Sequence, residues 1–267
     1  MEGRRRTNVE EVILEEREET ALITLNRPKA LNAFSTSLTT KLLNIIESLE
    51  RKREIKTVVI TGEGKGFCAG GDVKEFYQQQ DRWSHIMELA GILHQCIISI
   101  RKMPKPVIAA VNGVASGAGM SLVLACDLAV ADENASFNMA YIKIAASPDG
   151  GGSLTLSRTV GLKKASELIF SGCMVSAKEA LELGLINHIA PSGKTLEVAL
   201  EVAKELNQAP PLAVAACKEL INRSLFPDLE CHLEVEKRSI SRLGTTQDFQ
   251  EGLEAFFEKR SPKFKGV

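Results

Sequence analysis

Apolar residues are spaced along this chain in two ways, and the pattern changes near residue 190. Up to that point, short apolar runs of strand length alternate with longer segments in which apolar residues recur every three or four positions. The runs over residues 57–61 and 107–111 do not alternate with polar residues, which indicates strands buried on both faces. The spacing predicts an α/β fold, with a mixed core over residues 9–190 and a helical region over residues 191–267.

Turn and capping residues set the limits of the predicted elements. Apolar and polar residues alternate over residues 11–25, with charged residues at the centre, and this pattern predicts an antiparallel hairpin with a polar turn. Asp72 with Glu75, and Ser176 with Glu179, have the spacing of a capping box at the start of a helix. Further helices are predicted over residues 35–52, 82–101, 120–125, 153–158, 196–206, 211–225, 229–243 and 246–259, and short strands over residues 127–131 and 135–137.

The charge and hydrophobic content indicate which kinds of protein and partner this chain fits. With 267 residues, 44% of them hydrophobic, the chain has enough apolar surface for a substantial core. Lys and Arg together number 33 against 34 for Asp and Glu, so the formal net charge of -1 gives no reason to expect nucleic acid or a membrane surface as partner. No apolar run is long enough to cross a bilayer. We expect a cytoplasmic protein with a loose tail over residues 1–8.

Cysteine and histidine residues show neither a disulfide pattern nor a metal-binding pattern. The cysteines are widely spaced without a C-x-x-C pair, and they are interpreted as reduced core residues. His85 and His94 lie in the predicted helix over residues 82–101, and neither has an acidic or cysteine partner at catalytic spacing. They are interpreted as solvated or packing residues, and no metal site is expected. The cysteines are Cys68, Cys96, Cys126, Cys173, Cys217 and Cys231.

Small residues over 115–119 run directly into a predicted helix. The unpaired N–H groups at a helix start can stabilise an oxygen that carries negative charge. The same small residues would also allow tight helix packing, and both interpretations stand on these residues alone. Gly71 precedes the cap at Asp72 and offers a second N–H donor in a loop. Residues 64–69 match G-x-G-x-x-A, but the next helix begins only after Asp72, which argues against dinucleotide binding.

Asp149 lies between Pro148 and three glycines, in a loop where the backbone can approach a substrate closely. Taken by itself, the position is more typical of an ordinary N-cap for the helix over residues 153–158.

The loops over residues 67–73 and 112–119, followed by Cys126 and Asp127, resemble those of the crotonase superfamily of enoyl-CoA hydratases and isomerases. The likeness extends from about residue 9 to the C-terminus, including residues 26–28 and 258–262. It implies a crotonase-like spiral of ββα units, with a helical C-terminal region that forms homotrimers, often paired into hexamers. It also implies an acyl-CoA thioester substrate, held at its carbonyl oxygen by the N–H groups of Gly71 and Ala118, and no cofactor beyond the coenzyme A of the substrate.

The residues at the acid–base positions point to isomerisation. Family hydratases carry two glutamates, and the motifs align those positions with Ser121 and Tyr141, neither of which is a carboxylate. Hydration needs one group to activate water and another to protonate carbon, so their loss argues against a standard hydratase. Asp149 aligns with the single acid or base of Δ3,Δ2-enoyl-CoA isomerases, and residues 246–252 extend the likeness to ring-epoxide phenylacetyl-CoA isomerases. The resemblance therefore favours a catalytic Asp149 over a capping one.

Other residues are assigned to substrate binding through the same resemblance. Arg27, Lys29 and Ala30 fall on the side of the adenine and phosphates, and Lys259 and Lys263 lie in a tail that often reaches the 3'-phosphate held by a neighbouring subunit. Two alternatives remain open: a hydratase, lyase or hydrolase with relocated acid–base groups, and a non-catalytic acyl-CoA-binding module. The remaining predicted substrate-binding residues are Ala69, Gly70, Asp72, Val73, Ser121 and Tyr141, and the candidates for an apolar wall around Asp149 are Phe137, Met139, Ala140 and Ile144.

Overall fold

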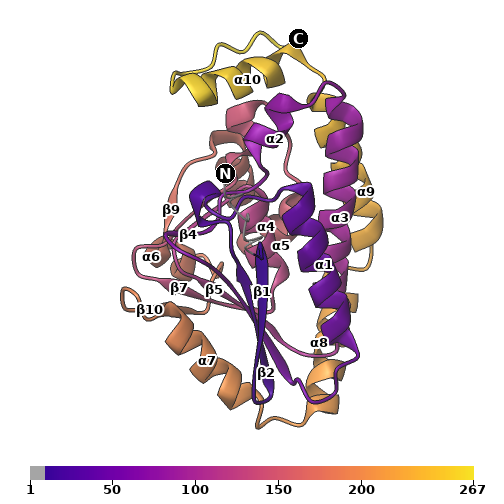
Figure 1. Cartoon of the computed structure of the whole chain (residues 1–267), viewed down its shortest axis with the longest axis vertical. Coiled ribbons are helices and arrows are strands. Elements are labelled where there is room, and N and C mark those ends of the chain that lie inside the picture. Colours follow the sequence, from indigo (N-terminus) through magenta and orange to yellow (C-terminus); the bar gives the residue numbers. More distant parts are fainter. Residues whose placement is uncertain (1–9) are drawn as a thin grey trace, which may run out of the picture.

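The computed structural model describes residues 10–267 (Figure 1). The tail predicted over residues 1–8 lies outside the described residues. The chain starts with the predicted antiparallel hairpin, formed by β1 (Val12–Arg17) and β2 (Thr20–Leu25). In chain order the elements that follow are η1 (Pro28–Ala30), α1 (Thr36–Glu50), β3 (Thr57–Gly62), β4 (Gly66–Cys68), α2 (Val73–Gln78), α3 (Arg82–Lys102), β5 (Val107–Val111), β6 (Val114–Ser116), α4 (Ala118–Ala125), β7 (Leu128–Asp132), β8 (Ser136–Asn138), η2 (Ala140–Ile144), α5 (Gly152–Ser171), β9 (Val175–Ser176), α6 (Ala177–Glu182), β10 (His188–Ala190), α7 (Thr195–Leu206), α8 (Pro211–Leu225), α9 (Leu229–Leu243) and α10 (Gln247–Glu258).

Two sheets organise the strands. The larger has the order β1-β2-β3-β5-β7-β10, and all its pairs after the initial hairpin are parallel. The smaller has the order β4-β6-β8-β9. Three successive pairs, β3 with β4, β5 with β6, and β7 with β8, place their first strand in the larger sheet and their second in the smaller one, before a helix follows. This is the α/β spiral of ββα units that the sequence resemblance implied.

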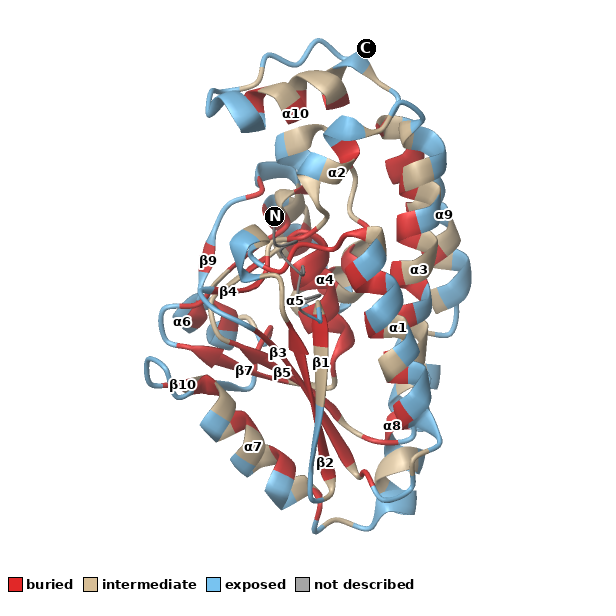
Figure 2. Ribbon diagram, in the orientation of Figure 1, coloured by how far each residue is buried: buried red, intermediate tan, exposed pale blue. Residues whose placement is uncertain are grey.

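Both faces of the larger sheet are covered, which explains the uninterrupted apolar runs. Val58 and Ile60 of β3 point into the main core, which includes residues of α1, α3 and α4. Val59 points to the opposite face, where it joins a second apolar cluster with Ala199 and Ala203 of α7. Figures 1 and 2 show α7 on one side of the strands and the long helices α1 and α3 on the other, and the strands are mostly red, that is buried, in Figure 2. The burial predicted for residues 57–61 and 107–111 is therefore confirmed.

Of the two predicted capping boxes, one is complete and the other forms only in part. The Ser176 side chain and Glu179 form the complete capping box at α6, and Asp72 accepts hydrogen bonds from the first turn of α2. Glu75, however, does not return to the backbone of Asp72. Its carboxylate accepts instead from the backbone N–H and the hydroxyl of Thr36, which ties α2 to the start of α1. A tertiary partner has replaced the local one.

Two other expectations needed correction. The helix predicted over residues 153–158 is longer, because α5 continues to Ser171 across a break at Gly161. All the cysteines are free, as expected, but Cys173, Cys217 and Cys231 are exposed rather than buried in the core. Their apolar neighbours in the sequence were misleading, because Cys217 and Cys231 lie on exposed faces of α8 and α9 and Cys173 lies in the loop after α5. Among residues 10–267, no helix has the length and apolar character needed to cross a membrane.

Candidate active site

A mostly apolar cavity of about 160 Å³ lies where the loops after β4 and β6 meet α3, α9 and α10. The apolar walls come from α3, through Ile86, Leu89 and Leu93, and from α10, through Phe249 and Phe256. These helices are far apart in the sequence, and the fold brings them to the same opening. The predicted site residues on its lining are Ala69, Gly70, Gly71, Val73, Ala118, Tyr141 and Asp149, together with Ala140 and Ile144 of the predicted apolar wall.

The two predicted oxyanion loops touch at the cavity. A methyl group built on Gly70 would lie 2.8 Å from the carbonyl oxygen of Ser116 and 3.4 Å from the backbone nitrogen of Ala118, so the loops need a glycine there. Helix α4 begins at Ala118, and its cap, Gly117, has φ of 51° and provides no side-chain acceptor. Among residues 10–267, the loop hydrogen bonds give the N–H groups of Gly71 and Ala118 no protein acceptor. Both donors are therefore available to a ligand oxygen.

Asp149 is the only acidic residue among the described residues that line the cavity. The residue is only 4% exposed. Helix α5 begins after Gly151, which provides no side-chain cap, so the capping role considered for Asp149 is wrong. The positive φ angles of Gly150 and Gly151, 66° and 75°, turn the chain between Asp149 and the helix. The aspartate is thereby separated from the N–H groups that it would have capped.

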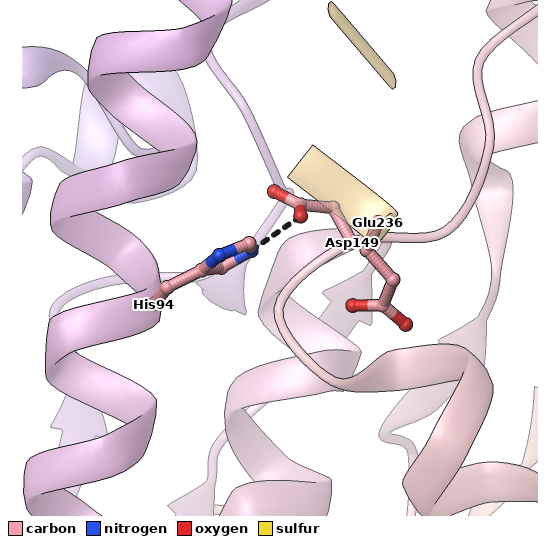
Figure 3. Close-up of side chains that lie close together, drawn as sticks. All are labelled: His94, Asp149 and Glu236. Atoms are coloured by element: carbon pink, nitrogen blue, oxygen red, sulfur yellow. Dashed lines mark hydrogen bonds and ion pairs between the residues drawn. The ribbon is translucent and has the colours of Figure 1, made fainter. Parts of the chain in front are cut away.

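His94 projects from α3 towards Asp149 (Figure 3), and its Nε2 lies 2.6 Å from Oδ1 of the aspartate. Both side chains are buried. The prediction that His94 lacks an acidic partner was wrong, because the partner lies 55 positions away along the chain and is brought close only by folding. His85 also has an acidic neighbour, since its Nε2 lies 4.0 Å from Oε1 of Glu75. It still fits the packing interpretation better, because its ring packs against that of Phe76 with ring centroids 6.0 Å apart.

Two hydroxyl groups fix the backbone of Asp149. Ser121 and Tyr141 donate to the Asp149 carbonyl oxygen at 2.7 Å and 2.9 Å, and their own oxygens are 3.1 Å apart. Burial raises the pKa of the Tyr141 phenol well above its ordinary value, and the charge of Asp149 raises it further. The phenol therefore stays protonated and can donate. The two positions that align with hydratase glutamates here hold the loop of the aspartate.

Glu236 of α9 completes the support of this loop, although sequence reasoning did not identify it. Its carboxylate accepts from the backbone N–H of Gly151 at 2.7 Å and of Ser153 at 3.1 Å, at the start of α5. The residue is buried, yet in the sequence it is one of several glutamates on a highly charged helix, which gave no signal. His94, Asp149 and Glu236 have potential ligand atoms within 4.8 Å of one another (Figure 3).

Removing one of the hydroxyls tests this support. We expect Tyr141→Phe to lower the free energy of unfolding by about 1 kcal/mol, the usual net value of a buried hydrogen bond, since Ser121 still satisfies the carbonyl. Adding Ser121→Ala should cost more than the same change in the wild type, because the buried carbonyl then keeps only the longer, 3.2 Å hydrogen bond from the backbone N–H of Gly152. Urea unfolding of the two single variants and the double variant measures the coupling. Additive costs would contradict a shared role.

The residues assigned to coenzyme A lie away from the cavity lining. Arg27 donates to the Ala33 carbonyl and to Asp72 at 2.9 Å, so its charge is largely paired inside the protein. Lys29 is exposed, Ala30 is half-buried in η1, and Lys259 and Lys263 are exposed after α10. Ser121 lies behind the cavity wall, and the two remaining wall candidates, Phe137 and Met139, pack in the main core.

Comparisons of the sequence and of the structure with known proteins agree with one another. The family model for enoyl-CoA hydratase/isomerase matches residues 15–267. The 2,3-dehydroadipyl-CoA hydratase of Escherichia coli (strain K12) is 37% identical, over 96% of this chain and 99% of that protein. The 1,2-epoxyphenylacetyl-CoA isomerase of the same organism is 34% identical, over 91% of this chain and 94% of that protein. The crystal structure of an enoyl-CoA hydratase from Mycobacterium avium subsp. paratuberculosis K-10 superposes with a TM-score of 0.88 at 31% identity, covering 96% of this chain and 99% of that one.

Proposed function

Since the chain belongs to the enoyl-CoA hydratase/isomerase family, we propose that this enzyme moves the double bond of a 3-enoyl-CoA to give the 2-enoyl-CoA, with Asp149 as both base and acid. The observation that carries the proposal is the composition of the cavity. Asp149 is the single carboxylate among the described residues on its lining, and it lies in the same cavity as the free N–H groups of Gly71 and Ala118. One carboxylate beside an oxyanion hole is the minimum that a proton shift requires.

The reaction consists of two proton transfers through one intermediate. Asp149 removes a proton from C2, the C2–H electrons become part of a dienolate, and the negative charge collects on the thioester oxygen. The N–H groups of Gly71 and Ala118 stabilise that charge, an effect of about 3 kcal/mol per donor when judged by removal. The protonated Asp149 then returns the proton to C4. The shift involves no net oxidation, so we propose that coenzyme A, as part of the substrate, is the only cofactor-like group needed.

The surroundings of Asp149 favour isomerisation over standard hydration. In the hydratases of the family, two glutamates divide the work of activating water and protonating carbon. Here the aligned residues, Ser121 and Tyr141, use their hydroxyls to hold the Asp149 carbonyl. The walls of the cavity are mostly apolar, with Leu89, Leu93 and Phe249 among them, which disfavours a bound water at the reacting carbon.

Two related reactions have specific support as alternatives. The similarity to the 1,2-epoxyphenylacetyl-CoA isomerase supports a ring-epoxide substrate, for which the same oxyanion donors and carboxylate would serve. The His94–Asp149 pair, together with the similarity to the 2,3-dehydroadipyl-CoA hydratase, supports hydration by relocated acid–base groups. Asp149 and His94 would then supply the two acid–base groups that hydration needs, although His94 is not on the cavity lining.

A panel of acyl-CoAs tests these proposals directly. The purified enzyme is incubated with an aliphatic 3-enoyl-CoA, the matching 2-enoyl-CoA and an aromatic ring-epoxide acyl-CoA, and each product is identified by chromatography and mass. We expect the 3-enoyl-CoA to give the 2-enoyl-CoA without a change of mass. Water added to the 2-enoyl-CoA, seen as a gain of one H₂O, would instead establish the hydratase alternative. A non-catalytic acyl-CoA-binding module would bind these thioesters and convert none.

We also propose that the protein assembles in the cytoplasm as a homotrimer or a dimer of trimers. Large apolar side chains on α5 and α8, including Leu162, Phe170 and Leu212, are 73%, 74% and 86% exposed and are available to a partner subunit. Light scattering of the purified protein gives the mass directly. A monomer at micromolar concentration would contradict the proposal.

A further inference from the structure

The geometry points to His94 as a positioning residue for Asp149, an inference that rests on the proposed function. We propose that the imidazole holds one oxygen of the carboxylate and thereby aims the other at the substrate carbons. Nε2 of His94 lies 2.6 Å from Oδ1 of Asp149. Both residues are buried, each with 4% of its surface exposed. Buried pairs at this distance are hydrogen-bonded, and a charged acceptor makes the bond strong.

The direction of the hydrogen bond follows from the acceptor. A carboxylate that acts as a base has no proton and can only accept, so Nε2 of His94 carries the hydrogen. The structure gives Oδ1 this partner, and it shows no comparable hydrogen bond from the described residues to Oδ2. One oxygen of Asp149 is therefore fixed while the other remains free for proton transfer.

Fixing one oxygen matters because the same carboxylate must reach two carbons. An aspartate side chain can rotate about two bonds, and a misplacement of about 1 Å can cost about a hundredfold in rate. The backbone of Asp149 is already held by Ser121 and Tyr141 at its carbonyl, and the next turn is held by Glu236. The bond from His94 is the contact that fixes the remaining freedom, which is that of the side chain itself.

A metal ion is a poorer explanation of the same cluster. Two ligands of one tetrahedral zinc, each about 2.0–2.1 Å from the metal, lie about 3.3 Å apart. Nε2 and Oδ1 are closer than this, at hydrogen-bond distance. Both oxygens of Glu236, the third member, already accept from backbone N–H groups. His94 also lies behind Asp149 and not on the cavity lining, so it acts through the aspartate rather than on the substrate.

A series of variants at His94 separates a hydrogen-bonding role from simple packing. His94→Leu fills a similar space without a donor, and we expect kcat to fall about ten- to a hundredfold with KM nearly unchanged, because binding of the thioester is left intact. His94→Gln places its amide nitrogen two bonds beyond Cγ, as Nε2 is, and should recover most of the rate. His94→Asn is one bond shorter and should not. His85→Gln, on the same helix, is the matched control and should leave kcat unchanged.

A substrate-free measurement separates this inference from the proposed function. In protein labelled with ¹⁵N-histidine, the Nε2 proton of His94 should give a far-downfield resonance that is lost in His94→Leu and moves upfield in Asp149→Asn, since a neutral amide is a weaker acceptor. If this resonance is present but the wild type converts no 3-enoyl-CoA, the proposed function fails and the same variants are assayed on the substrate that the panel identifies. Equal kcat in His94→Leu and wild type, or equal loss in His94→Gln and His94→Leu, overturns the positioning role.

Discussion

Replacing Asp149 with Asn should lower kcat for 3-enoyl-CoA isomerisation by about a thousandfold, within the range usual for the loss of a general base. The change keeps the size of the side chain and an oxygen that can accept from His94, so the loop should keep its shape. An amide, however, cannot take a proton from C2. The assay follows the conjugated thioester spectroscopically, beside an unfolding curve that should match the wild type.

The same variant shows whether substrate binding survives. In the proposed mechanism Gly71 and Ala118, not Asp149, hold the thioester oxygen, so binding of a saturated acyl-CoA should be nearly unaffected in Asp149→Asn. Turnover close to that of the wild type would refute the assignment of Asp149. Loss of both binding and folding would point to a structural role for the carboxylate.

Gly119→Ala should be the second most damaging change, because it separates the two oxyanion loops. A methyl group at this position would lie 2.1 Å from the backbone oxygen of Cys68, far inside van der Waals contact. Cys68 ends β4 and leads directly into the loop of Gly71, so relief of the clash must move one oxyanion donor away from the other. We expect kcat to fall about 10²–10³-fold, the usual effect of losing one oxyanion donor.

Gly91→Ala is the matched control for that experiment. Gly91 lies inside α3, and a methyl group there meets nothing within 4 Å. Alanine is favoured over glycine in a helix interior, so the free energy of unfolding should rise by about 0.5–1 kcal/mol with kcat unchanged. Steady-state kinetics and urea unfolding of both variants decide the matter. A Gly119→Ala variant as active as Gly91→Ala would remove the case for an oxyanion hole between these loops.

Much of the fold was open to prediction because its signals are local. The apolar runs over residues 57–61 and 107–111 predicted strands buried on both faces, and Asp72 and Ser176 marked the starts of α2 and α6. The two candidate oxyanion loops were assigned through the family resemblance, and the structure supplies a physical reason for their glycines, since Gly70 approaches Ser116 closely and Gly117 has a positive φ. The end of α5 was missed because no apolar stripe continues across Gly161.

The partners of Asp149, the proposed acid and base, could not be predicted in the same way. His94 was interpreted as a packing residue and Glu236 was not identified, although both reach the loop of Asp149. Neither lies near it in the sequence, and neither belongs to a motif. Glu75 shows the same effect, since its carboxylate binds Thr36 instead of its local capping partner.

The sequence by itself determined most of the strands and helices, and its family resemblance indicated the two candidate oxyanion loops and an aspartate where hydratase glutamates are missing. These features depend on hydrophobic spacing and backbone conformation, which neighbouring residues set. Only the tertiary structure decided that Ser121 and Tyr141 hold the carbonyl of that aspartate and that His94 binds its carboxylate. Such contacts join side chains from different elements, and their geometry is fixed by how the helices pack, which no local pattern records.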